Sequence, residues 1–156
     1  MTINVQVKGK NTREFEHLFD TYVEGRANSA FNIFLSNMSN EDKNLIVSVD
    51  GYGVMDDLPA SKNSKGFVLA VGENAHITKN IASGKELCFF GDDRVDYRSG
   101  GVIGVAEISG DDIDIQTIYY DDVRGLKRRG IVLDDNLDAF PGIKKQYALQ
   151  KKRAID

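Results

Sequence analysis

The chain has 156 residues, 41% of them hydrophobic and 28% charged, and this balance predicts one globular domain, residues 1–156, with a single core. No stretch approaches the ~20 apolar residues of a membrane-spanning helix, and the first ten residues lack the apolar run of a signal peptide, so we expect a cytoplasmic protein with no membrane partner. The net charge of −4 is segregated into an acidic body, residues 1–123 with a net charge of −9, and a basic end, residues 124–156 with a net charge of +5.

In chain order, the sequence first predicts a strand over residues 3–7, where apolar and polar residues alternate. Residues 11–25 then predict an amphipathic helix, because apolar residues recur at the i, i+3, i+4, i+7 and i+8 spacing of one helical face. That face comprises Phe15, Leu18, Phe19, Tyr22 and Val23. Asn11 and Glu14 are spaced as a capping box at the start of this helix, and Gly25 supplies a left-handed stop at its end.

Residues 29–38 predict a second helical segment, whose apolar residues keep helical spacing. These residues are Phe31, Phe34, Leu35 and Met38. Residues 44–55 and 67–71 are mostly apolar runs next to turn-forming residues, which is typical of strands. Residues 73–84 fit either a short helix or an exposed loop.

Residues 102–109 and 113–120 predict a β-hairpin. Gly110, Asp111 and Asp112 can form its tight turn, because Gly and Asp adopt turn conformations at low steric cost.

Beyond a basic turn, residues 131–140 predict a helix, and residues 143–156 predict a weak terminal helix. Taken together, the elements predict an α+β fold. We expect a single domain with a mainly antiparallel sheet, an amphipathic N-terminal helix or helices, and a basic helical C-terminal end over residues 124–156.

Few side chains are suited to catalysis. His17 lies off the apolar face of the first predicted helix, and His76 is flanked by Thr78 but has no recognisable nucleophile or orienting acid near it in the sequence. The single cysteine, Cys88, lies in a predicted strand and is expected to be a buried, unreactive thiol. We therefore expect no catalytic residue and no cofactor.

Acidic residues gather at the predicted turns. The clusters that we expect to bind a partner are Asp92, Asp93 and Asp96, then Asp111 and Asp112, and then Asp121 and Asp122. Aspartate is common in turns because it bonds to the local backbone, and none of these clusters has the spacing of an EF-hand, so we expect no metal site; a hard cation such as Ca²⁺ or Mg²⁺ is the alternative. The expected surface continues into the basic turn through Arg124, Lys127, Arg128 and Arg129.

Residues 101–140 run from the predicted hairpin through this glycine-containing turn into a predicted helix. This order resembles the acetyl-CoA-dependent N-acetyltransferase superfamily, in which the amides of such a turn hold the cofactor pyrophosphate. The turn of that family has the pattern Gln/Arg-x-x-Gly-x-Gly/Ala. Alignment of Gly130 with the last glycine puts Gly125 at the first position and Arg128 at the fourth, and both depart from the pattern.

Three functions from different classes remain. We favour a small, acidic, non-catalytic binding protein of the inhibitor, immunity or accessory-regulator type, which engages a protein partner by charge complementarity. The alternative that the resemblance implies is a small-molecule or acyl-CoA-dependent transferase-like enzyme. A second alternative is a nucleic-acid-binding module that uses the basic C-terminal segment.

Overall fold

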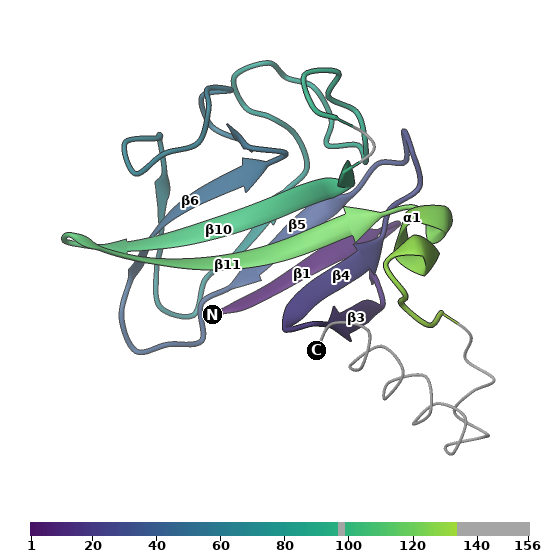
Figure 1. Cartoon of the computed structure of the whole chain (residues 1–156). Helices are drawn as coiled ribbons and strands as arrows, with labels where there is room; N and C mark the ends of the chain where they lie inside the picture. Colours follow the sequence, from purple (N-terminus) through teal and green to yellow (C-terminus); the bar gives the residue numbers. More distant parts are fainter. Residues whose placement is uncertain (97–98, 134–156) are drawn as a thin grey trace.

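Two β-sheets that share one core make up the described part of the chain (Figure 1). The structure is a computed structural model, and it describes residues 1–96 and 99–133. The smaller sheet has the strand order β2-β1-β5-β9, and the larger sheet has the order β3-β4-β11-β10-β6-β7, with β8 also paired to β6. The strands are β1 Thr2–Val7, β2 Lys10–Asn11, β3 Glu14–His17, β4 Asp20–Glu24, β5 Asn32–Ser36, β6 Lys43–Val49, β7 Tyr52–Gly53, β8 Phe67–Leu69, β9 Asn74–Ile77, β10 Gly101–Ser109 and β11 Asp112–Asp121.

The prediction of an α+β fold is wrong, because the fold is mainly β. Within the described residues, the one α-helix is α1, Val123–Arg128. None of the described helical structure is long and apolar enough to cross a membrane.

The predicted N-terminal helix is wrong, because this segment forms the β3–β4 hairpin. Phe15 and Tyr22 face each other across the antiparallel pair. Leu18 and Phe19 form the two-residue turn between the strands, with φ values of 53° and 71°. Two successive positive φ angles are what a type I′ turn requires, and that turn matches the twist of the flanking strands.

The second predicted helix is also wrong, since residues 29–38 contain β5. Ile33 and Leu35 are fully buried while Phe34 between them is only half-buried, which is the two-residue period of a strand. The segment with His76, expected to be a helix or a loop, includes strand β9, which pairs with β5.

The core lies between the sheets and draws side chains from both of them. Its fully buried large members include Phe31, Ile33, Leu35, Leu45, Phe89, Ile103 and Tyr120. Gly25 is needed here for space and not as a helix stop, because a Cβ at this position would lie 2.5 Å from the Phe89 ring. Tyr120 therefore sits at the point where β11, β4 and the loop around Phe89 meet.

The predicted hairpin is confirmed as β10 and β11. Its register is continuous from Gly101 opposite Tyr120 to Ser109 opposite Asp112. Figure 1 shows that the tip of this hairpin projects past the neighbouring strands. On its other side, β11 pairs with β4 in parallel, but only from residue 118 to residue 121.

The described part of the basic end is helical only over α1. Leu126 is fully buried and anchors this helix, and Gly130, with a φ of 89°, follows its last turn. The helix predicted over residues 131–140 does not begin where expected, since residues 131–133 are not helical. Residues 134–156, which include the rest of that helix and the predicted terminal helix, lie outside the described residues.

Candidate functional site

A cleft of about 480 Å³ opens beside β7. Residues 52–57 line one wall, and residues 80–88 and 91–94 line the others. Asn28 and Val49 complete the lining, so the cleft brings together residues that are up to 66 positions apart in the chain. Asp92 and Asp93, two of the predicted binding residues, lie in its lining.

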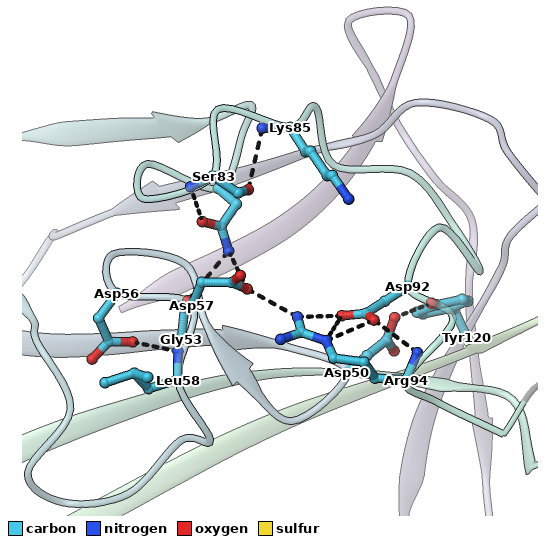
Figure 2. A network of polar contacts seen from close by, with 11 residues as sticks. Asp50, Gly53, Asp56, Asp57, Leu58, Ser83, Lys85, Asp92, Arg94 and Tyr120 are labelled. Carbon is cyan, nitrogen blue, oxygen red and sulfur yellow. Dashed lines mark hydrogen bonds and ion pairs between the residues drawn. The ribbon is translucent and has the colours of Figure 1, made fainter.

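Arg94 connects two walls of this cleft (Figure 2). Its Nη2 atom donates to Asp57 Oδ1 at 2.9 Å and to Asp92 Oδ2 at 2.6 Å, and its Nε atom donates to Asp92 Oδ1 at 2.9 Å. The guanidinium carbon lies 3.5 Å from the centroid of the Tyr52 ring, a cation–π contact. Asn80 Nδ2 donates to the same Asp57 oxygen at 3.2 Å and so ties in the third segment.

The turn that presents Asp57 is organised by its neighbour Asp56. The Asp56 carboxylate accepts the backbone N–H of Leu58 at 3.1 Å and that of Lys65 at 3.0 Å. These hydrogen bonds, that of Lys65 foremost, hold the pKa of Asp56 below its ordinary value. Asp57 itself has a φ of 57°, a conformation that Asp tolerates better than most residues.

Two of the carboxylates in the cleft, those of Asp57 and Asp92, are paired with Arg94. Hydrogen bonds that Arg94 donates to Asp92 lower the pKa of Asp92, and the hydrogen bonds that Arg94 donates to Asp92 and Asp57 raise its own pKa. The lining holds four acidic and two basic side chains in all, a formal charge of −2: Asp57, Glu86, Asp92 and Asp93 against Lys85 and Arg94. Since Arg94 is already bonded to two carboxylates, its main role is to hold the loops together.

A buried polar contact lies close to this network. The Tyr120 hydroxyl donates to Asp50 Oδ2 at 2.6 Å and accepts the backbone N–H of Phe90 at 3.1 Å, while the Val102 N–H donates to Asp50 Oδ1 at 3.0 Å. Burial raises the pKa of Asp50. This contact fixes the end of β6 against β10 and β11.

The reactive side chains of the chain are not assembled around the cleft. Cys88 lines it, but burial first and the charge of Glu86 second raise the pKa of the thiol, which disfavours the nucleophilic thiolate. The His76 ring packs against Phe34 at 4.7 Å on the other sheet. In the part of the chain that the structure describes, no group of three or more His, Cys, Asp or Glu side chains could hold a metal ion.

At the start of α1, the predicted acidic pair is engaged in the fold itself. Asp121 is only 3% exposed, and its carboxylate accepts from Arg129 Nη2 at 3.0 Å. Asp122 caps the helix by accepting the Gly125 N–H at 2.7 Å. Of the four predicted basic residues, Arg129 is therefore committed internally, whereas three are exposed on α1: Arg124, Lys127 and Arg128.

The same geometry separates this turn from the acetyltransferase turn. There, free backbone amides bind a pyrophosphate, but here the Gly125 amide is bonded to the Asp122 carboxylate. The Asp121 carboxylate packs so closely on Gly125 that a Cβ would overlap with it. Two carboxylates thus occupy the place of the expected anion, and they would repel it.

Three neighbouring acidic side chains at the tip of the β10–β11 hairpin have no cation beside them among the described residues. Asp111, Asp112 and Asp114 are exposed, and none of them has an ion pair or a side-chain hydrogen bond among the described residues. Nearby Glu107, in contrast, is paired with Lys43 at 2.7 Å. Asp114 lies on the same tip as the two predicted binding residues Asp111 and Asp112.

The predicted binding residues therefore lie in three separate places. Asp92, Asp93 and Asp96 are on the loop at the cleft, Asp111 and Asp112 are at the hairpin tip, and the others surround α1. The tip and α1 lie at opposite ends of the ten-residue strand β11, roughly 30 Å apart at about 3.3 Å per residue. The structure does not bring them together on one surface.

No protein family matches this chain, and no curated protein or solved structure is detectably similar to it.

Sequence reasoning missed Arg94, Asp57 and Asn80, which organise the cleft. Arg94 and Asp57 are 37 residues apart, and no periodic pattern signals a contact of that range. The only local signal was the Asp-x-Arg spacing of Asp92 and Arg94, whose side chains do bond to each other.

Proposed function

We propose that the protein is a non-catalytic binding protein, of the inhibitor, immunity or accessory-regulator type, that holds a basic protein partner through its β10–β11 hairpin. The proposal rests on the difference between the acidic clusters. Asp92 is neutralised by Arg94 and Asp121 by Arg129, whereas Asp111, Asp112 and Asp114 at the hairpin tip are left without a described cation. Of the three predicted clusters, the one at the tip is the one in which every carboxylate is exposed and none is bonded to an arginine of the described chain.

Charge at a projecting tip is suited to recognition. Exposed carboxylates on a hairpin that extends past the body steer a basic partner during encounter, and complementary charge selects it over acidic competitors. Exposed pairs of this kind add modest affinity and weaken with salt, so binding should be salt-sensitive.

The test compares two triple variants in affinity capture. Asp111→Lys, Asp112→Lys and Asp114→Lys reverse the tip charge, while Glu14→Lys, Glu24→Lys and Glu73→Lys make the same change at exposed positions away from the tip and the cleft. Each substitution adds two charges, so both variants go from the net charge of −4 to +2. We expect wild type and the second variant to retain a stoichiometric partner that elutes by about 0.5 M salt, and the tip variant to lose it. Equal retention by both variants would refute the proposal.

Nucleic-acid binding through α1 is the second candidate, since Arg124, Lys127 and Arg128 are exposed there. It is weaker, because Arg129 is held by Asp121 and by the Ser99 carbonyl. A salt-sensitive gel shift of duplex DNA by wild type that is lost on Arg128→Glu would favour this candidate, and no shift at low salt would eliminate it.

A further inference from the structure

The first half of β11 is an open sheet edge. β10 covers one side of the strand throughout, but pairing with β4 on the other side stops at Ile118 opposite Thr21. Residues 112–116 are all exposed, and no strand of the described chain pairs with their outer side. β4 cannot extend along this edge, because the chain reverses into β3 at the Leu18–Phe19 turn.

The hydrogen bonds show which backbone groups are free on this edge. The Gly25 N–H donates to the Asp121 carbonyl at 2.8 Å, so residue 121 directs its backbone groups towards β4. Val102, opposite Tyr119, directs its carbonyl away from β11, to the Asp50 N–H at 2.7 Å. Since the direction alternates along a strand, the backbone groups of the odd-numbered residues of β11 point outward, and within the described residues no strand pairs with the outward N–H and C=O groups of Ile113 and Ile115.

The side chains of β11 define the sequence pattern that a strand added to this edge must have. Ile113 and Ile115 share one face of the sheet and are 42% and 63% exposed. Asp112 and Asp114 share the other face. Neighbouring strands place side chains of the same face next to one another, so an added strand would need apolar residues beside the isoleucines and basic residues beside the aspartates.

A second copy of this chain does not meet these needs. Pairing of two β11 edges would bring Asp111, Asp112 and Asp114 of each copy together, six carboxylates in one place. Like charges on adjacent strands are destabilising, and charged side chains on an edge strand are a common means by which proteins prevent such self-pairing.

We propose that an extended strand of the basic partner, with alternating apolar and basic residues, adds to β11 beside Ile113 and Ile115. This inference rests on the proposed function and names the chemistry of its partner. The added strand lies in line with β4, and its end meets the fully exposed Phe19 side chain of the β3–β4 turn. Backbone hydrogen bonds to Ile113 and Ile115 supply affinity, and the alternating pattern supplies specificity.

The probe is a capped hexapeptide of alternating lysine and valine, with alternating glutamate and valine as its control. Binding is followed by NMR shifts and by amide exchange at Ile113 and Ile115. We expect the lysine peptide to bind and to slow both exchange rates, and the glutamate peptide not to bind. Equal binding of the two peptides, or binding that leaves both amides unprotected, would overturn the proposal. A wild-type dimer seen in sedimentation that protects the same amides would overturn it too.

Two substitutions at residue 115 distinguish the contribution of the backbone N–H to peptide binding from that of the side chain. Ile115→Pro removes an outward N–H without breaking the ladder to β10, because proline is tolerated where an edge N–H faces solvent. Ile115→Thr keeps that N–H. We expect the proline variant to bind the lysine peptide at least about tenfold more weakly, as the loss of an edge hydrogen bond implies, and the threonine variant to bind within about threefold of wild type. Equal affinity of the two variants would contradict strand addition.

Asp114→Lys serves if the proline variant does not fold, since it should reverse the preference between the two peptides. If the partner captured by wild type is retained by Ile115→Pro and lost by the triple tip variant, the strand-addition proposal is wrong and the proposed function stands. If the triple tip variant also retains that partner, the proposed function fails with it.

Discussion

At the scale of single residues, the protonation of Asp50 is coupled to folding. This residue is 7% exposed, and the burial that raises its pKa is partly offset by hydrogen bonds from Tyr120 and Val102. Its folded pKa lies above the ordinary value of 3.8, so the folded state binds this proton more tightly than the unfolded chain does. The resulting stabilisation is present below that ordinary value and is lost as pH rises through the folded pKa.

We therefore predict that the stability advantage of wild type over Asp50→Asn is largest at low pH and falls as pH rises above about 4. The variant should also be less stable by about 1–3 kcal/mol near pH 4, because asparagine has one acceptor oxygen for the two donors, the Tyr120 hydroxyl and the Val102 N–H, that the two Asp50 oxygens accept. Urea denaturation from pH 3 to pH 8 measures both effects.

Asp56→Asn is the matched control for this prediction. Backbone N–H groups lower the pKa of Asp56, so the stability that its carboxylate contributes is lost as pH falls. The difference in unfolding free energy between wild type and Asp56→Asn should therefore increase with pH, whereas the difference for Asp50→Asn decreases. If both differences in unfolding free energy changed with pH in the same direction, the opposite pKa shifts given for Asp50 and Asp56 would be contradicted.

At the scale of elements, the β3–β4 turn combines backbone strain with an exposed aromatic ring. Leu18 and Phe19 both have positive φ, and Phe19 is fully exposed, so neither backbone preference nor burial favours these residues. Asparagine followed by glycine is the pair that this turn type prefers. The presence of an aromatic residue there agrees with a contact role at the end of the open edge of β11.

We predict that Leu18→Asn with Phe19→Gly stabilises the protein by about 1–2 kcal/mol, because the strain at two non-glycine residues is relieved. Lys8→Asn is the control, because the Lys8–Gly9 turn already has glycine at the second of its two positive φ positions. This substitution should raise the free energy of unfolding by less than the double substitution does. Chemical denaturation measures the free energy of unfolding of both variants. A double variant less stable than wild type would show that the apolar side chains of the turn support the fold.

The same turn explains why the sequence predicted a helix. A two-residue hairpin is symmetric about its turn, so an apolar turn at residues 18 and 19 with an apolar cross-strand pair at Phe15 and Tyr22 has the spacing i, i+3, i+4, i+7. One face of a helix has the same spacing. The β10–β11 hairpin was predictable because Gly110 and Asp111 mark its turn and both strands alternate. The cleft was not, because its contacts join residues such as Arg94 and Asp57 that only the completed fold brings together.

At the scale of the whole molecule, β11 connects two surfaces of opposite charge. The acidic tip lies at its start, and the exposed basic side chains of α1 follow its end. Between them, the strand changes from an open edge to a fully paired strand at residue 118. This change is the central feature of the account, since it leaves acidic side chains and unpaired backbone groups on one projecting element.

Amide hydrogen exchange along β11 of the free protein tests this feature most directly. Asp114 and Gln116 direct their N–H groups to β10 and should exchange slowly, whereas Ile113 and Ile115 direct theirs to solvent and should exchange at least about tenfold faster. Tyr119 and Tyr120, which lie where β11 is paired on both sides, should both be slow. If Ile113 and Ile115 are as protected as Asp114 and Gln116, the edge is covered and the account of this hairpin as an open binding element is wrong.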